Sequence, residues 1–162
     1  MSRSGDKKTN AQREAEASGH PVKALTYDPR AALGGTEVAA LLGEDPDAVF
    51  KTLVTQGRTG GHLVFIVPVS GELDLKRAAQ AAGEKAVAMI HQRELLPLTG
   101  YVHGGCSPLG MRRPFPTFID ETALLYDQVF FSGGRRGLQL RMSPEHLAQL
   151  ADARFCDLLC RR

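Results

Sequence analysis

The fold is decided by residues 48–69, AVFKTLVTQGRTGGHLVFIVPV. Two runs rich in β-branched and aromatic residues, 48–56 and 62–69, flank the glycine-rich segment 57–61. Such residues favour pleated strands, and a short connection that contains glycine favours a tight turn between them. The stretch therefore predicts an antiparallel β-hairpin near the centre of the chain.

Lys51 stands out inside the first of these strands because its neighbours are apolar or β-branched. Removing an ammonium group from water costs several kcal/mol unless an anion or hydrogen-bond acceptors meet it. Two glycine-rich segments downstream, 104–110 and 132–137, can present backbone amides to a ligand without interfering side chains. The lysine and the two segments together suggest a pocket that binds an anion.

The rest of the chain mixes short helices and strands without a regular βαβ repeat. Helices are expected where a capping residue starts an apolar stripe and a glycine or proline ends it. The expected helices cover 37–42, 75–82, 91–96 and the C-terminal residues from 144 onward. The expected additional strands cover 87–90, 115–119, 126–132 and 138–142. This order favours an α+β domain with a mixed sheet over a doubly wound fold.

Composition narrows the classes of function. The 162 residues, 43% of them hydrophobic, suit one globular domain. The net charge of +2 gives no overall cationic field, so nucleic acid would need a local basic patch. The candidates for that patch are Arg112, Arg113, Arg135 and Arg136. The apolar stretches are shorter than the roughly 20 residues of a membrane-spanning helix, which indicates a soluble protein without a membrane partner.

The two ends of the chain give further expectations. Residues 1–19 are small and charged and lack the hydrophobic segment of a targeting peptide, so we expect a disordered tail followed by a domain over 20–162. Three cysteines without a secretory signal indicate a reducing, cytoplasmic location. Cys156 and Cys160 lie four residues apart on the expected C-terminal helix, but no second pair of ligands is near, and we expect no metal and no cofactor.

A cysteine nucleophile is one catalytic hypothesis. Cys106 follows His103, a candidate base, by three residues, but no orienting acid is evident in the same loop. Neither glycine-rich segment matches a phosphate-binding or dinucleotide-binding loop. We therefore favour a structural thiol, and a thiol hydrolase that uses Cys106 remains the alternative.

Five segments occur in an order that is hard to obtain by chance: 28–29, 49–53, 67–76, 99–110 and 129–138. They resemble the YbaK/ProX-type aminoacyl-tRNA editing domains, the free-standing relatives of the editing insertion of bacterial prolyl-tRNA synthetase. The resemblance spans about residues 21–160 and is closest to the Cys-tRNA(Pro) deacylases. It implies a mixed sheet, partly closed like a barrel, with flanking helices and a pocket for the aminoacyl-adenosine end of tRNA.

The resemblance also implies roles for single residues. Lys51 takes the central role of holding the 3′ end of the tRNA, the backbone amide of Gly104 faces the scissile ester, and Ser132 lies beside the substrate amino acid. The other implied substrate-binding residues are Tyr27, Thr52, Gly105, Ser107, Pro108 and Gly133. The resemblance further implies that the substrate's own thiol takes part in the attack, so the protein supplies positioning and oxyanion stabilisation.

Three positions depart from the pattern of these relatives. Leu25 and Tyr27 occupy the tyrosine and histidine places of a motif before Asp28-Pro29, Gly34 replaces a bulky aromatic residue, and Gln139 replaces an acidic one. The implied function is a trans-editing hydrolase for mischarged Cys-tRNA(Pro), with prolyl-tRNA synthetase as a candidate partner in a ternary complex. Another small amino acid, as in Ala-tRNA(Pro), is an alternative substrate. A module of the same fold that binds tRNA or a synthetase without turnover is the alternative function.

Overall fold

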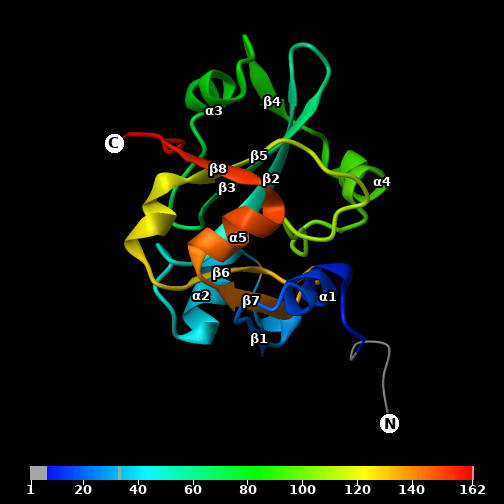
Figure 1. Cartoon of the computed structure of the whole chain (residues 1–162), viewed down its shortest axis with the longest axis vertical. Helices are drawn as coiled ribbons and strands as arrows, with labels where there is room; N and C mark the ends of the chain where they lie inside the picture. Colours follow the sequence, from blue (N-terminus) through cyan, green and yellow to red (C-terminus); the bar gives the residue numbers. More distant parts are fainter. Residues whose placement is uncertain (1–6, 33, 162) are drawn as a thin grey trace.

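The expected hairpin lies at the centre of the larger of two sheets (Figure 1). In the computed structural model, which describes residues 7–32 and 34–161, β2 (Phe50–Gly57) pairs antiparallel with β3 (His62–Pro68). β4 (Val87–Met89) pairs antiparallel with the outer side of β2. β5 (Thr117–Asp120) and β8 (Ala153–Cys156) extend the other side in parallel, which gives the order β4-β2-β3-β5-β8.

The smaller sheet is antiparallel and has the order β1-β7-β6. Its strands are β1 (Lys23–Thr26), β6 (Val129–Ser132) and β7 (Leu138–Met142). A parallel bridge between Val49 and Phe130 joins it to the start of β2, and Phe130 N–H donates to the Ala48 carbonyl at 3.0 Å. The α+β class is thus confirmed, but the described residues form two sheets joined at this bridge and not a closed barrel.

The helices are short and lie around these sheets (Figure 1). They are α1 (Asn10–Ala17), α2 (Gly35–Leu42), α3 (Leu75–Ala82), α4 (Leu95–Thr99) and α5 (Pro144–Ala151), with 3₁₀ turns η2 (Pro29–Ala31), η3 (Gln92–Glu94) and η4 (Glu121–Leu125). Gly43 and Gly83 end α2 and α3 with φ values of 69° and 71°, as the sequence predicts. The expected turn at 91–96 continues into α4 through Pro97, which lies in the first helical turn, where its missing N–H has no intrahelical partner. No helix in the described ranges is long and apolar enough to cross a bilayer.

The disordered tail expected over 1–19 is wrong for residues 10–17, which form α1, while residues 1–6 lie outside the described residues. Thr9 caps this helix by accepting a hydrogen bond from Gln12 N–H at 3.1 Å. Ala11 and Ala15, one turn apart, are completely buried. Small side chains on this face let the helix backbone pack closely against the rest of the domain.

The expected C-terminal helix is correct at its start and wrong at its end. The Ser143 side chain caps α5 and Pro144 occupies its first position, as predicted. The helix ends at Ala151 because Asp152 adopts a left-handed conformation with φ 50°, and β8 follows. Cys156 therefore ends a strand and does not share a helix face with Cys160.

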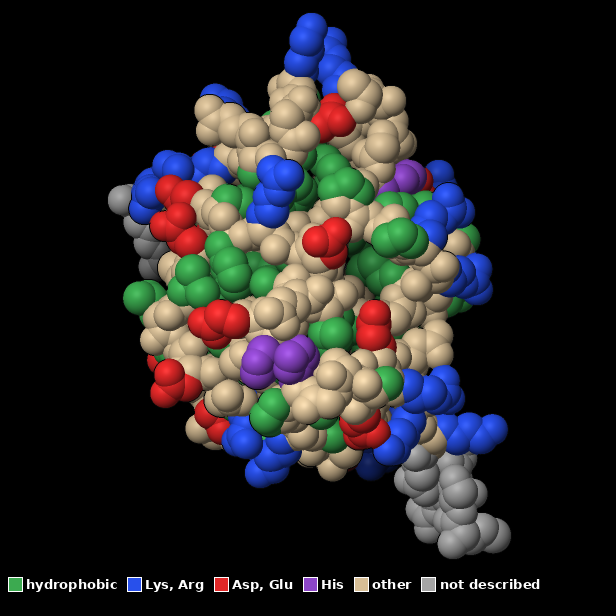
Figure 2. Space-filling model, in the orientation of Figure 1, with side chains coloured by type: hydrophobic (Ala, Val, Ile, Leu, Met, Phe, Trp, Pro, Cys, Tyr) green, Lys and Arg blue, Asp and Glu red, His purple; other side chains and the backbone are tan. Residues whose placement is uncertain are grey.

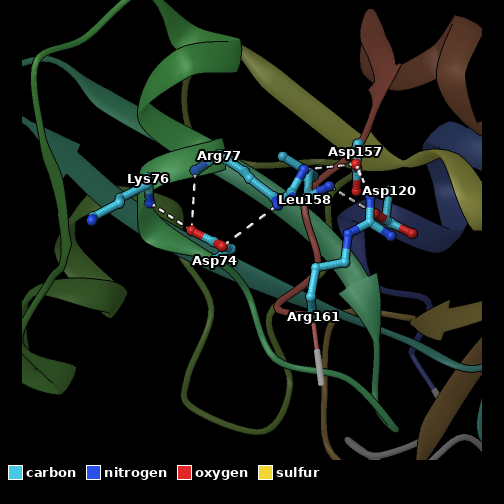
Figure 3. Close-up of polar contacts among 7 residues, drawn as sticks. All are labelled: Asp74, Lys76, Arg77, Asp120, Asp157, Leu158 and Arg161. Atoms are coloured by element: carbon cyan, nitrogen blue, oxygen red, sulfur yellow. Dashed lines mark hydrogen bonds and ion pairs between the residues drawn. The ribbon is translucent and has the colours of Figure 1, made fainter.

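The C-terminal segment is held by a network of charged side chains (Figure 3). Asp120, at the end of β5, is 1% exposed and accepts a hydrogen bond from Leu158 N–H at 2.9 Å. Asp157 pairs with Arg77 of α3 at 2.7 Å and with Arg161 at 2.6 Å. Asp74, which caps α3, donates its own backbone N–H to the Leu158 carbonyl at 2.7 Å.

The largest group of buried side chains unites both sheets. Phe50 and Ile66 come from the larger sheet, and Phe131 and Leu140 come from the smaller one. The start of β2 thus lies where the two sheets pack together, and Lys51 lies one residue beyond Phe50. The fold places the unusual lysine at the junction of the two sheets.

Candidate functional site

A cavity of about 380 Å³ adjoins this junction. Residues 49–54 of the β2 region line one part of it, and the ends of β6 and β7 contribute Ser132 and Gln139. The first glycine-rich segment contributes Gly104, and α2 contributes Gly35 and Val38. Segments that are far apart in the sequence therefore meet around one hollow.

Many of the predicted site residues line this cavity. They are Tyr27, Lys51, Thr52, Gly104, Ser132 and Arg136. The lining also includes residues that sequence reasoning missed, among them Met89, Ile90, Gln92 and Leu95. Met89 ends β4, Ile90 follows it, and Gln92 and Leu95 begin η3 and α4. Nothing in their local sequence distinguishes them from ordinary core or surface residues.

Lys51 is a weakly compensated cation. Its side chain is 30% exposed, and its Nζ lies 3.9 Å from Oε1 of Glu72, a side chain that is itself 84% exposed. No other carboxylate in the described part of the chain lies within 4.0 Å of Nζ. An exposed ion pair at this distance contributes little, so the ammonium remains available to an anionic or carbonyl-rich ligand.

Gly104 provides a backbone donor at the cavity. Its φ of 85° lies in the left-handed region, which favours glycine. An added Cβ would lie 3.2 Å from Cδ of Arg136, so the arginine side chain packs directly over this residue. Among the hydrogen bonds of the described residues, none uses the Gly104 N–H.

Ser132 provides a hydroxyl group at the same cavity. Its Oγ accepts a hydrogen bond from Gly134 N–H at 3.2 Å. This bond uses a lone pair and leaves the hydroxyl proton to donate to a ligand. Gly104 and Ser132 thus supply two hydrogen-bond donors.

Two buried polar atoms of the cavity wall lack a protein partner. Oγ1 of Thr52 and Oε1 of Gln139 have no hydrogen bond within the described residues. Gln139 is only 6% exposed, and both residues line the cavity. Most buried polar atoms in proteins are paired, so these two are exceptions in the wall of the cavity.

Four predicted substrate-binding residues do not line the cavity: Gly105, Ser107, Pro108 and Gly133. Ser107 is fully buried, and its Oγ accepts from Leu109 N–H at 3.3 Å. A Cβ on Gly105 would lie 2.8 Å from Cα of Arg135, and one on Gly133 would lie 2.5 Å from Cγ of Leu138. The structure places these residues behind the cavity wall, where they shape the two glycine-rich segments.

Cys106 lines the cavity but is 8% exposed. Burial raises the pKa of its thiol to about 12. His103 also lines the cavity, and no hydrogen bond joins it to Cys106 among the described side chains. A thiol with this pKa is protonated at neutral pH, and a protonated thiol is a poor nucleophile.

The four arginines of the predicted patch have different surroundings. Arg136 lies at the cavity, and Arg112 packs on Gly100 and donates to the Pro97 carbonyl at 3.4 Å. Arg135 donates to the Lys7 carbonyl at 2.9 Å. Arg113 is exposed. Lys and Arg side chains gather along the right-hand edge of the face in Figure 2, over α1 and α4. None of the four arginines forms an ion pair with a described carboxylate.

Metal-ligating side chains do not gather in this site. Within the ranges 7–32 and 34–161, no three His, Cys, Asp or Glu side chains are grouped so that they could hold a metal ion. The described residues offer the Lys51 ammonium, the Arg136 guanidinium, the His103 imidazole, and backbone and hydroxyl groups around a largely apolar hollow. Such a site can hold a polar ligand and stabilise negative charge on a carbonyl oxygen.

Comparison with known proteins gives the family. The family model described as "Aminoacyl-tRNA editing domain" matches residues 31–150. A relative from Enterococcus faecalis, named "Putative Cys-tRNA(Pro)/Cys-tRNA(Cys) deacylase EbsC", is 40% identical over 152 residues, which are 93% of this chain and 93% of the relative.

Two crystal structures share the fold with a TM-score of 0.84 each. One is described as "a putative trans-editing enzyme for prolyl tRNA synthetase"; it is 28% identical, and the match covers 94% of this chain and 96% of the other. The second is of a hypothetical protein, 26% identical, with coverage of 93% and 99%. The resemblance seen in the sequence segments is confirmed, and the chain belongs to the aminoacyl-tRNA editing domain family.

Proposed function

We propose that this chain is a trans-editing hydrolase that cleaves the ester bond of mischarged Cys-tRNA(Pro). The observation that carries the proposal is the position of Lys51, a weakly paired ammonium at a cavity that also contains Gly104 N–H and Ser132 Oγ. The names of the relative and of the structural neighbour support this substrate class. Prolyl-tRNA synthetase is a candidate partner in a ternary complex.

Each residue has a distinct task in this proposal. Lys51 attracts the phosphate and carbonyl oxygens of the aminoacyl-adenosine end and fixes its place in the cavity. The Gly104 amide donates to the ester carbonyl oxygen as that oxygen becomes negatively charged. Ser132 donates to the bound aminoacyl group. Catalysis then depends on positioning and charge stabilisation, in agreement with the raised pKa of the Cys106 thiol.

The volume and the lining of the cavity fit such a substrate. A substrate thiol is small enough for a cavity of about 380 Å³ with a largely apolar lining. These features support a small aminoacyl group, and alanine is the alternative to cysteine.

A deacylation assay tests this function. The protein is incubated with Cys-, Ala- and Pro-tRNA(Pro) at matched concentrations, and the remaining aminoacyl-tRNA is measured over time. We expect the fastest hydrolysis with Cys-tRNA(Pro). Lys51→Ala should remain folded and lose about 10²-fold or more in rate, because a misplaced substrate loses the benefit of orientation. Lys76→Ala is the matched control, since Lys76 is an exposed lysine on α3 away from the cavity.

Two results would count against the proposal. An unchanged rate in Lys51→Ala would remove Lys51 from its assigned role. Tight binding of the aminoacyl-tRNA without hydrolysis of any of the three substrates would favour the binding module instead.

A further inference from the structure

We propose that the N-terminal helix α1 is a positioning element for the cavity, in which Thr9 and Glu14 tie down the two glycine-rich segments 104–110 and 132–137. These segments supply Gly104 and Ser132 to the cavity. The tie itself is independent of substrate, whereas its effect on rate rests on the proposed deacylase function.

Glu14 holds the end of the first segment. Its Oε2 accepts a hydrogen bond from Gly110 N–H at 2.6 Å. Gly110 has a φ of 70°, and an added Cβ would lie 2.6 Å from the backbone nitrogen of Ala11. The helix backbone therefore lies directly on Gly110, and the Glu14 carboxylate fixes the orientation of its amide.

Tyr101 forms hydrogen bonds both to the first segment and to the backbone of α1. Its hydroxyl donates to the Leu109 carbonyl at 2.7 Å, and the ring is 6% exposed. Burial raises the Tyr101 pKa, while a hydrogen bond from the Ala11 backbone acts in the opposite direction. The phenol thus links the first turn of α1 to the residue that precedes Gly110.

Thr9 holds the second segment. Its hydroxyl donates to the Gly133 carbonyl while its oxygen accepts the capping bond from Gln12 N–H. The Thr9 side chain also lies against Gly134, where an added Cβ would be 3.0 Å from Thr9 Cβ. Two residues before Thr9, the Lys7 carbonyl accepts a hydrogen bond from Nη1 of Arg135 at 2.9 Å.

The two segments contact each other beneath these ties, because Gly105 allows the backbone of Arg135 to approach closely. Ala11 and Ala15 belong to the same buried group as Leu109 of the first segment. The backbone of Ala11 lies against Gly110, and the capping residue Thr9 lies against Gly134, so the start of the helix contacts both segments. Catalytic donors must be held to within about 0.5 Å, and a displacement of about 1 Å can cost 10²-fold in rate. A loosened α1 should therefore lower kcat more than it changes KM.

Point variants of the full chain test the tie. Glu14→Ala removes the acceptor for Gly110 N–H. Glu14→Gln keeps an acceptor oxygen, so its exchange rates and kcat should stay close to those of the wild type. Glu16→Ala is the control on the same helix, since Glu16 pairs with Lys8 and Gln12 and not with either segment. Thr9→Val removes both the donor to Gly133 and the capping acceptor for Gln12 N–H, and Thr9→Ser retains both.

Three measurements are made on each variant: amide hydrogen exchange, kcat and KM for Cys-tRNA(Pro), and the melting temperature. We expect faster exchange in 104–110 for Glu14→Ala and in 132–137 for Thr9→Val, with unchanged exchange in the distant turn 57–61. We expect kcat to fall about tenfold for Glu14→Ala, which loses a hydrogen bond to a charged group, and about fivefold for Thr9→Val, which loses a bond between neutral groups, with KM within about twofold in both.

Unchanged exchange in both segments would overturn the proposal, even if the melting temperature fell, because α1 would then only stabilise the fold. Faster exchange with unchanged kcat would overturn the link between the tie and the rate. A wild-type protein without deacylase activity would instead count against the proposed function, and the exchange rates would still decide whether α1 positions the two segments.

Discussion

Lys51 and Gln139 show what single residues reveal in the sequence. The apolar neighbours of Lys51 marked it as a functional candidate, and the structure places it at the cavity. Its partner Glu72 lies in a loop after β3, and no local pattern could have paired the two. The unpaired Oε1 of Gln139 depends on the packing of β7 against distant segments, which the sequence does not describe.

Cys106 was favoured as a structural thiol, and the raised pKa of about 12 supports that interpretation. We expect iodoacetamide at pH 8 to modify the exposed Cys160 and to leave the buried Cys106 intact in the folded protein. Cys106→Ala should keep its deacylation rate within about threefold, because attack does not use this thiol. Peptide mass spectrometry and the deacylation assay check both statements. A loss of activity together with an acyl adduct on Cys106 would favour the thiol hydrolase.

The same thiol should affect stability at high pH. Its folded pKa lies above the ordinary value of 9.0, so the unfolded chain loses this proton first as the pH rises. The contribution of the buried thiol to the unfolding free energy is complete below about pH 9 and is lost as the pH approaches 12. The free energy of unfolding in urea is measured at pH 8 and at pH 10. Between these two pH values it should fall less in Cys106→Ala than in the wild type. The remaining loss comes from groups such as Cys156, whose pKa burial raises to about 11.

At the scale of elements, the central hairpin and α3 were predictable because their periodicity and capping residues are local. The helix α1 was not, since its buried face consists only of Ala11 and Ala15 in a charged sequence. The strand β8 was missed for a different reason. Asp152, and not a glycine, ends the preceding helix, and the partner of β8 is β5, more than thirty residues earlier.

Asp120 connects these distant elements and should therefore be important for stability. Its carboxylate accepts from Leu158 N–H at 2.9 Å and from Thr122 N–H at 3.1 Å, at a position that is 1% exposed. We expect Asp120→Ala to lower the free energy of unfolding by about 2–3 kcal/mol, because it leaves buried donors without an acceptor. Asp127→Ala, at an exposed position, is the control and should change the free energy of unfolding by less than about 0.5 kcal/mol. Urea unfolding monitored by circular dichroism measures both. Equal effects of the two substitutions would contradict the role of Asp120 as a buried anchor.

For the whole molecule, the sequence predicted the α+β class, the main strands and the principal cavity residues. It did not predict the separation into two sheets, because that depends on long-range pairing such as the bridge between Val49 and Phe130. The position of the cavity at the junction of these sheets follows from the same pairing. The family resemblance, and not the periodicity, assigned Gly104 and Ser132 to the site.

The overall charge of +2 leads to a prediction about tRNA binding. Phosphate contacts must be concentrated locally, and Arg112, Arg113, Arg135 and Arg136 are the proposed patch. In filter-binding or fluorescence titrations over a range of salt concentrations, each lost phosphate contact should reduce the log–log slope by about 0.7–0.9. We expect single alanine variants to reduce the slope stepwise and the quadruple variant to reduce it most.

Arg58→Ala and Arg154→Ala are the matched controls, because both arginines are exposed and lie outside the proposed patch. Circular dichroism must show that the quadruple variant remains folded, since Arg135 and Arg136 also pack on the glycine-rich segments. An unaltered slope in a folded quadruple variant would make these arginines ordinary surface charges.

The tight contact between Gly105 and Arg135 also has an evolutionary consequence. A side chain at position 105 would collide with backbone atoms of Arg135 and Arg136, which cannot rotate away, so the contact behind the cavity wall does not tolerate substitution. Gly34 is in the opposite situation, since an added Cβ would meet nothing closer than Oε1 of Glu37 at 3.7 Å. A substitution at Gly34 can therefore narrow the cavity for a smaller amino acid, whereas one at Gly105 would displace the backbone of the second glycine-rich segment.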